Sequence, residues 1–503
     1  YRRFWDATCD TRFASGVYLP ILEEDSTSTG LEVIRASTAF KGNLWGIWQD
    51  DSSRSVVARK YDADDDPMWE AGGDILKGLE VQTVASGTVG AVGSQTIGLN
   101  FTGARAGVLV GVIQRGGGGS YYPTAVTWNS NAMSSLGTQS VATTHVSLWG
   151  LANDDDGSHN VVITWGDGNV TNAVSFAIGF SGVHQTSPFG SSTTGTASST
   201  APSIAVTSVA DDIVVDALGA VDTVGDLVEA TVGSGQTQRL NTAAAYLRAA
   251  ASTETATGTS TTMSWTLDTS EAWALAGVAV KPELTAALDI FPVRTHLLAL
   301  LAIDDGIHVY RSSDGATWAP STTNELGSSV LADTVAAHEN IDAGLLSEIG
   351  GEAVATIWDE DSATITFFSS TNAGDNWTDE AVDISSGNGP QGVAVLAGID
   401  NEDKLYIGTR EGLYEVDTAP STWTTRLIFS MIGNNDNCRR MKVMDDGALW
   451  FAQGVDNDTP PIVYRMFVSN GARVIERVPN DFSLGDGLTS DALGPIRWMI
   501  SAD

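Results

Sequence analysis

Two short runs of acidic residues are the sequence's main candidates for metal binding. One run contains Asp154, Asp155 and Asp156, and the other contains Asp456 and Asp458. Carboxylate oxygens close together in a loop are hard ligands of the kind that Ca²⁺ prefers. The alternative is that both runs form solvated polar turns. Calcium is therefore the one cofactor that the sequence leaves open.

Other reactive groups do not form a recognisable site. The six histidines lack the spacing of zinc ligands. The glycine run at 116–119 is not followed by the Lys-Ser/Thr pair or the helix of a phosphate-binding loop. The Gly-x-Ser-x-Gly elbow of many hydrolases is also missing. The sequence thus predicts no catalytic residue from these motifs.

Two turn-like segments share a pattern of small polar residues, glycine and tryptophan. The first runs from Ser312 to Trp318, and the second runs from Ser370 to Trp377. An Asp or Asn side chain can bond the backbone ahead of it, Gly accepts a positive φ, and Trp packs the turn onto a sheet. The residues concerned are Ser312, Asp314, Gly315 and Trp318 in one segment and Ser370, Asn372, Gly374 and Trp377 in the other. Both segments resemble the Asp-box of sialidase-type β-propellers, which implies turns that staple a blade rather than catalyse.

The tryptophans of this pattern recur at the period of propeller blades. Trp318 and Trp377 are 59 residues apart, and Trp377 and Trp423 are 46 apart. Trp69 ends a degenerate copy, but it precedes Trp318 by 249 residues. Removing an insert of roughly 200 residues reduces this gap to about 49, the length of one blade. The spacing predicts that the chain is all-β. It predicts a β-propeller of about six blades, into which a jelly-roll-like β-sandwich is inserted.

The predicted domains are the first part of the propeller at 1–80, the inserted sandwich at 81–282 and the remaining blades at 283–503. The insert contains some ten short apolar strands and no convincing helix, which favours one two-sheet sandwich. The alanine-rich stretch at 241–251 could be a short helix or an edge strand. In a propeller the first and last blades are neighbours, so Cys9 and Cys438 could form a ring-closing disulfide; the alternative is two free buried thiols.

The insert also resembles a β-sandwich module of predicted tailed-phage virion proteins and some secreted bacterial proteins. The resemblance lies in segments spread over most of the insert, which are 126–129, 146–151, 161–165, 180–189, 210–216 and 273–282. The module implies a fold and no particular ligand.

The resemblance to sialidases requires a search for their active site, which uses three arginines, a Tyr–Glu pair and an aspartic acid. The motif that carries their first arginine is missing, and Val33–Arg35 is the nearest segment. Tyr406 and Tyr414 are interpreted as strand aromatics. No context selects a triad from the candidate arginines, which are Arg294, Arg410, Arg439, Arg440 and Arg497.

Charge restricts the partners that the chain can bind. The sequence has 62 acidic and 26 basic residues, a formal net charge of −36. Such a charge argues against binding nucleic acid or anionic membrane surfaces. No run of 18 apolar residues predicts membrane insertion. The sequence starts at Tyr1 without a signal peptide, from which we expect a processed or excerpted part of a longer protein.

Together these observations favour a non-enzymatic structural protein of a virus or phage particle, in the tail, a fibre or the head surface. Expected partners are other virion subunits, further copies of the chain and a host-surface glycan, at the virion surface or outside the cell. One alternative is a sialidase-like glycoside hydrolase with a carbohydrate-binding insert. Another is a secreted microbial adhesin. The function rests on analogy between folds.

Overall fold

The computed structural model describes residues 32–477 apart from gaps, the longest of which are 51–55, 63–67, 117–121, 222–227, 329–343, 386–391, 431–436 and 455–461. All regular secondary structure among the described residues is β-strand. A helix long and apolar enough to cross a membrane is not found in this part of the chain. The chain forms two compact units: a propeller unit of residues 1–50, 56–75 and 285–503, and a sandwich unit of residues 51–55 and 76–284.

The propeller unit contains five antiparallel sheets whose strands pair in chain order. The first sheet consists of β1 (Glu32–Phe40), β2 (Asn43–Asp50), β3 (Val56–Asp62) and β4 (Met68–Trp69), with β5 (Gly73–Leu76) also paired to β3. The second consists of β23 (Thr285–Val293), β24 (His296–Ile303), β25 (Gly306–Ser312) and β26 (Ala319–Ser328). The third consists of β27 (Gly344–Ile349), β28 (Glu352–Asp359), β29 (Thr364–Ser370) and β30 (Thr378–Ser385). The fourth consists of β31 (Gly392–Ile399), β32 (Glu402–Gly408), β33 (Gly412–Asp417) and β34 (Thr424–Ser430). The fifth consists of β35 (Asn437–Val443), β36 (Leu449–Gly454), β37 (Ile462–Ser469) and β38 (Ala472–Arg477).

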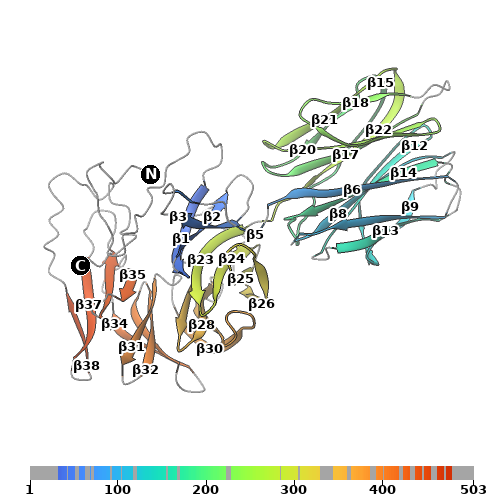
Figure 1. Ribbon diagram of the computed structural model, residues 1–503. Helices are drawn as coiled ribbons and strands as arrows, with labels where there is room; N and C mark the ends of the chain where they lie inside the picture. The colour runs from blue at the N-terminus through green and yellow to red at the C-terminus, as the bar shows by residue number, and fades with distance from the viewer. Residues whose placement is uncertain are drawn as a thin grey trace, which may run out of the picture. The chain divides into compact units, whose positions relative to one another are not determined.

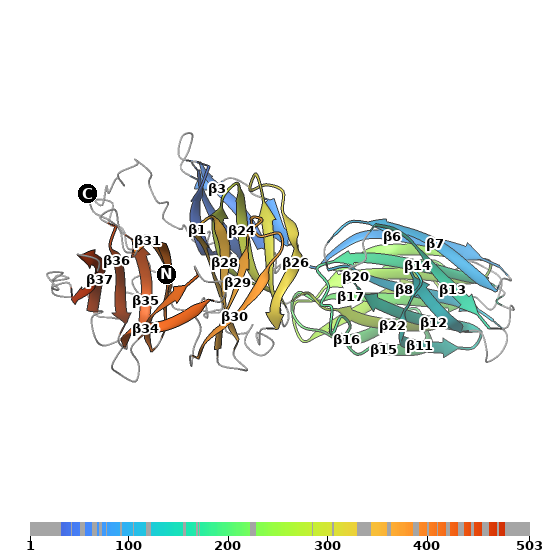
Figure 2. The same cartoon turned by 90° about the horizontal axis from the view of Figure 1, so that it is seen from below.

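These sheets are arranged as the blades of a propeller (Figures 1 and 2). The first strand of each sheet contacts the first strand of the next, from β1 through β23, β27 and β31 to β35. The prediction of an all-β propeller is confirmed. The described residues contain five blades, and the predicted sixth stays a prediction because 1–31 and 478–503 lie outside them.

Apolar side chains fill the spaces between successive blades. In β24 every residue after His296 is buried, so this strand is apolar on both faces rather than alternating. One core cluster combines second-blade residues such as Leu298 with Ala355 and Trp377 of the third. Further clusters join the third blade to the fourth and the fourth to the fifth. The blades are therefore held together by sheet-to-sheet burial.

The sandwich unit contains four sheets. A four-stranded sheet has the order β10 (Asn131–Ala132), β9 (Pro123–Trp128), β13 (Gly157–Trp165), β7 (Ser94–Phe101). A five-stranded sheet has the order β11 (Ser134–Val141), β12 (Thr144–Ala152), β8 (Gly107–Arg115), β14 (Asn172–Ser181), β6 (Glu80–Val89). A second five-stranded sheet has the order β15 (Thr193–Ser199), β22 (Glu271–Val280), β17 (Ile213–Val221), β20 (Leu247–Thr255), β19 (Thr237–Ala244). The last sheet has three strands in the order β16 (Ser203–Thr207), β21 (Ser260–Leu267), β18 (Ala230–Val232).

The unit has more layers than the single two-sheet sandwich that the strand pattern predicts. One core lies between the first two sheets, a second lies between the last two, and a third joins the two five-stranded sheets. The sequence pattern missed β6, β11 and β15, whose small polar residues alternate weakly. The alanine-rich stretch at 241–251 is the end of the edge strand β19 and the start of the interior strand β20, not a helix.

A buried carboxylate lies in β17, inside the second pair of sheets. Asp216 accepts hydrogen bonds from the Ser252 backbone N–H and hydroxyl at 2.7 and 2.8 Å, and from Trp265 Nε1 at 2.6 Å. Gln236 continues the network by donating to Ser252 Oγ at 2.6 Å. Burial raises the pKa of Asp216 to about 7, even though the three hydrogen bonds favour the ionised form.

We expect Asp216 to make the sandwich unit less stable as the pH rises. Its pKa is 3.8 without the fold and about 7 within it, so its contribution is complete below pH 3.8 and is lost as the pH rises to about 7. A shift of that size corresponds to at most about 4 kcal/mol. Calorimetric melts of the wild type and of Asp216→Asn between about pH 4 and 8 test this. The variant should melt with a shallower pH dependence, and an equal slope would exclude Asp216 as the cause.

Candidate functional site

The turn after β25 is held by its own polar groups. Ser312 Oγ accepts from the backbone N–H of Gly315 at 2.8 Å, and Asp314 Oδ1 accepts from those of Ala316 and Thr317 at 2.9 and 2.8 Å. Trp318 Nε1 donates to the Gly315 carbonyl at 3.0 Å. The bonds from Thr317 and Ala316 lower the pKa of Asp314 to about 2, so this carboxylate is ionised at neutral pH.

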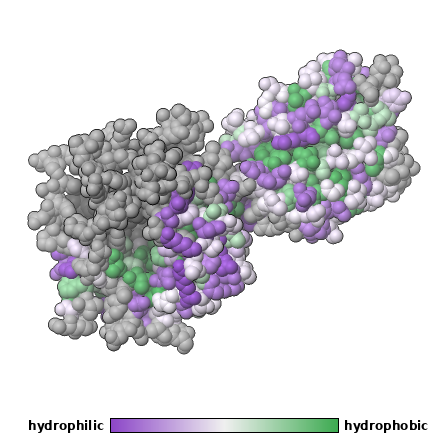
Figure 3. All heavy atoms as spheres, viewed as in Figure 1, coloured by the Kyte–Doolittle hydropathy of each residue, from purple (hydrophilic) through white to green (hydrophobic). Residues whose placement is uncertain are grey.

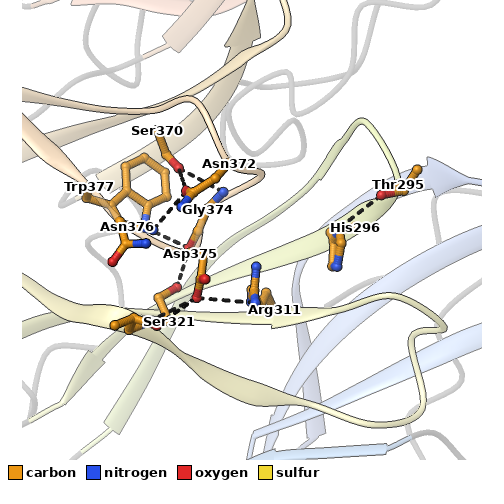
Figure 4. A network of polar contacts seen from close by, with 11 residues as sticks. Thr295, His296, Arg311, Ser321, Ser370, Asn372, Gly374, Asp375, Asn376 and Trp377 are labelled. Atoms are coloured by element: carbon orange, nitrogen blue, oxygen red, sulfur yellow. Dashed lines mark hydrogen bonds and ion pairs between the residues drawn. The ribbon is translucent and has the colours of Figure 1, made fainter.

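The turn after β29 repeats this arrangement one blade later (Figure 4). Ser370 Oγ accepts from the Gly374 N–H at 3.0 Å, and Asn372 Oδ1 accepts from the Asn376 N–H at 2.9 Å. Trp377 Nε1 donates to the Gly374 carbonyl at 3.0 Å, the same bond and length as in the earlier turn. The polar side chains of both turns are therefore occupied in holding backbone.

Both turns pack against the preceding blade through their glycines. A methyl group at Gly315 would lie 2.0 Å from the ring of Trp45 in β2, and one at Gly374 would lie 2.7 Å from Leu298 Cδ2 in β24. Both glycines have a φ of +79°. Glycine is favoured at such φ values, and only glycine allows such close approach, so these positions join one blade to the next.

Polar contacts reinforce the second of these joints. Asp375 accepts from the Thr322 hydroxyl at 2.9 Å and forms an ion pair with Arg311 at 3.2 Å (Figure 4). The Ser321 hydroxyl donates to the Gly374 carbonyl. These partners come from β25 and β26 of the second blade, so the turn of the third blade is fastened to its neighbour.

The other two tryptophans of the predicted series lie at the last strands of their sheets, Trp423 directly before β34 and Trp69 within β4. Trp423 is buried and packs on Phe367 of the third blade, with ring centroids 6.2 Å apart. Trp69 lies in β4 opposite Tyr61, and its side chain is not described.

A Tyr–Glu pair with two arginines exists in the structure, although the sequence did not single it out. Tyr406 Oη donates to Glu415 Oε2 at 2.7 Å. Arg473 contacts the same carboxylate oxygen at 2.6 Å and Tyr406 Oη at 3.3 Å. Arg426 contacts Glu415 Oε1 at 3.0 Å. These are residue types of a sialidase active site, so their position decides what they can do.

This group of four side chains lies between the fourth and fifth blades. Tyr406 and Glu415 belong to the second and third strands of the fourth blade, and Arg473 belongs to the last strand of the fifth. Tyr406 is fully buried, and burial raises the pKa of its phenol well above the ordinary value. A buried phenol of raised pKa is a poor nucleophile. The ion pair between Glu415 and Arg473 connects the two blades, and removing one partner of such a pair is destabilising.

A third inter-blade contact involves the first strands. Asp289 follows a β-bulge in β23 and accepts from the Ile290 N–H at 2.9 Å and from the Leu346 N–H of β27 at 2.8 Å. Burial raises the pKa of its carboxyl group to about 7. The only sequence signal for this bridge is one acid within an otherwise apolar strand.

The candidate arginines do not assemble into a described triad. Arg294 lies in the turn between β23 and β24 and donates to the Thr371 carbonyl at 3.1 Å. Arg35 lies in β1, and Arg439 and Arg440 lie in β35, where their side chains are not described. Arg410 and Arg497 lie outside the described residues, and Tyr414 donates to Glu411 at 3.2 Å.

The predicted calcium and disulfide residues lie beyond what the structure describes. This applies to Asp154, Asp155, Asp156, Asp456, Asp458 and Cys9, and to the side chain of Cys438. Within the described part of the chain, no group of three His, Cys, Asp or Glu residues could hold a metal ion. Calcium binding and the disulfide stay predictions.

Comparison with known proteins assigns no family to the chain. No family model and no curated protein matches the sequence. Among solved structures, the Hadza microbial sialidase Hz136 matches at 10% identity over 55% of this chain and 76% of that one, with a TM-score of 0.24. The NanB sialidase of Streptococcus pneumoniae matches at 10% identity over 88% of this chain and 67% of that one, with a TM-score of 0.28.

We expect Gly374→Ala to destabilise the propeller unit more than Gly447→Ala does. Both glycines have positive φ, +79° and +74°, but only Gly374 faces a side chain within 4 Å. The shared backbone strain costs about 1 kcal/mol, and the clash with Leu298 adds about 1–3 kcal/mol. Thermal melts of the two full-length variants compare them. Equal decreases in melting temperature would mean that the contact between Gly374 and Leu298 does not contribute to stability.

The two arginines on Glu415 should differ in importance. Arg473 is 23% exposed, whereas Arg426 is 63% exposed. Arg473→Met should cost about 2 kcal/mol because it removes a partner from a buried carboxylate, and Arg426→Met should cost less than about 1 kcal/mol. Chemical denaturation measures both variants. A larger loss for Arg426→Met would contradict the inter-blade role of Arg473.

Proposed function

We propose that this chain is a non-enzymatic attachment and assembly protein of the kind that a tailed-phage or related particle carries on its tail, fibre or head surface. In this proposal the turns at 312–318 and 370–377 are Asp-boxes, and the sandwich unit at about 81–282 is an insert between the first and second blades. The propeller serves as the scaffold and the insert as a display element.

The observation that carries the proposal is the position of the Tyr–Glu pair. A sialidase-like enzyme needs these groups open to substrate, together with arginines that bind the substrate carboxylate. Here Tyr406 is fully buried, and Glu415 already binds Arg473 and Arg426. The residue types of the enzyme are thus used to join blades, which favours a structural role.

The distribution of charge supports neutral partners for the insert. Residues 81–282 contain 13 acids and 5 bases, a net charge of −8, so the other 301 residues carry −28 of the total −36. The visible face of the sandwich unit mixes residues of high, intermediate and low hydropathy (Figure 3). A weakly charged surface suits neighbouring subunits or a host-surface glycan better than nucleic acid or an anionic membrane. We propose these partners, further copies of the chain among them, at the virion surface or outside the cell.

A second candidate function is a sialidase-like glycoside hydrolase with a carbohydrate-binding insert. The contact of 2.7 Å between Tyr406 Oη and Glu415 favours it, because such a pair activates a tyrosine nucleophile. Access to Tyr406 would then require the fourth and fifth blades to separate.

We expect the purified full-length chain to bind an immobilised glycan without releasing the fluorophore from a fluorogenic sialoside. Tyr406→Phe and Glu415→Gln should retain this binding and melt at lower temperature, because they weaken a joint. Sialoside cleavage by the wild type that disappears in Tyr406→Phe, with an unchanged melting temperature, would establish the hydrolase instead.

A protein inventory of purified particles and of cell-free supernatant separates the remaining possibilities. Many copies per particle support the virion role. Detection only as free protein in the supernatant, with glycan binding retained, would replace it by a secreted microbial adhesin.

A further inference from the structure

The sandwich unit consists of two sets of strands in the same order. Its five-stranded sheets have the orders β11-β12-β8-β14-β6 and β19-β20-β17-β22-β15. Its smaller sheets contain β9-β13-β7 and β18-β21-β16. Counted along the chain, every strand of the second set corresponds to one of the first, and β10 is the one described strand without a counterpart.

The hydrogen-bond registers around the two central strands also coincide. The central strand β8 pairs over nine residues with both β12 and β14, and β17 pairs over nine residues with both β20 and β22. The edge strands β11 and β19 each have a β-bulge at the same rung, whereas the opposite edge strand β6 has a bulge that β15 lacks. In β11 the bulge follows Ser135, opposite Trp149, and in β19 it follows Gln238, opposite Ser252. Trp149 and Ser252 are each the sixth residue of their strands.

The connections into the central strands match as well. Residues 102–106 and 208–212 each contain five residues, and the fourth has left-handed backbone in both, with φ of 57° at Arg105 and 73° at Asp211. In both connections the carbonyl of the fifth residue accepts a hydrogen bond from the backbone N–H of a residue in the corresponding place. Ala106 O accepts from Asn153 N at 3.2 Å, and Asp212 O accepts from Ala256 N at 2.8 Å. A sandwich does not require bulges and left-handed residues at fixed places, so their coincidence indicates a common origin.

We propose that residues 80–181 and 193–280 are two copies of one eight-stranded module, and that the face of its five-stranded sheet is the surface by which one copy binds another. This face is buried between the two copies, where one apolar cluster combines residues of β8, β12 and β14 with residues of β17, β20 and β22. Figures 1 and 2 show these two sheets facing each other.

The two faces differ in side-chain size at matched positions. The first copy has Ile113, Leu148 and Phe176 where the second has Gly219, Ala251 and Ala276. A small residue is needed at position 219, because a methyl group at Gly219 would lie 2.6 Å from Thr144 Cγ2 and 3.0 Å from Ile113 Cγ2. Large side chains of one face thus meet small ones of the other.

This difference determines the partner. Two first-copy faces would overpack, and two second-copy faces would leave voids. The surface therefore accepts one partner, the complementary copy of the module, and in the intact chain that copy is already present.

Cleavage of the folded full chain tests the proposal. One protease recognition sequence is inserted at residue 77, between Thr186 and Ser187 and at residue 284, so that digestion separates the two copies from each other and from the propeller unit. Size-exclusion chromatography and native mass spectrometry should then find the two fragments as a one-to-one complex. Separate fragments, or complexes of one fragment with itself, would overturn the proposal.

A matched pair of variants keeps the test specific to this surface. Gly219→Phe should abolish co-elution after cleavage, whereas Gly98→Phe, in β7 outside that sheet, should leave it intact. If Gly219→Phe does not fold, Thr144→Cys/Gly219→Cys in the uncut chain replaces it. A disulfide between these positions should hold the cut fragments together under denaturing conditions, and its failure to form would place the two faces apart. None of these outcomes depends on what the protein binds.

Discussion

The structure depends on burying the apolar faces of its sheets against one another. A single sheet exposes both of its faces to water, and burial of apolar surface contributes about 25 cal/mol per Å². In the propeller unit the second, third and fourth blades each lie between two described neighbours, and all but the first residue of β24, in the second blade, are buried. In the sandwich unit the five-stranded sheets lie in the interior, and all nine residues of β17 are buried. Both units are stacks of sheets in which interior strands become apolar on both sides.

Several polar side chains of the propeller unit connect neighbouring blades. Asp375 and Arg311 join two blades at their turns, Asp289 joins two first strands, and Glu415 with Arg473 joins the fourth blade to the fifth. Apolar packing has little directional preference, whereas a hydrogen bond fixes a distance and an angle. Charged side chains of the types that often catalyse reactions therefore connect neighbouring blades here.

The sequence predicted those parts of the fold that depend on local chemistry. The turns at Gly315 and Gly374 were recognisable because their bonds join residues only three or four positions apart, and the tryptophan spacing predicted the blade period. The joint between Glu415 and Arg473 was not recognisable, because the two residues are 58 positions apart and neither lies in a motif. The four layers of the sandwich unit were missed for a similar reason. Strands such as β15, which contains only Thr, Gly, Ala and Ser, acquire their place by pairing with β22 rather than by their own pattern.

Joining two copies of a module in one chain changes what their shared surface can become. Between separate identical copies related by a two-fold axis, each residue must suit the same residue set on its partner, so a large side chain near the axis meets itself. Within one chain each copy can change alone. Gly219 on one face leaves room for Ile113 and Thr144 on the other. As a consequence, neither face is available to bind another protein. The two smaller outer sheets and the connecting loops are then the parts of the unit that can contact a partner.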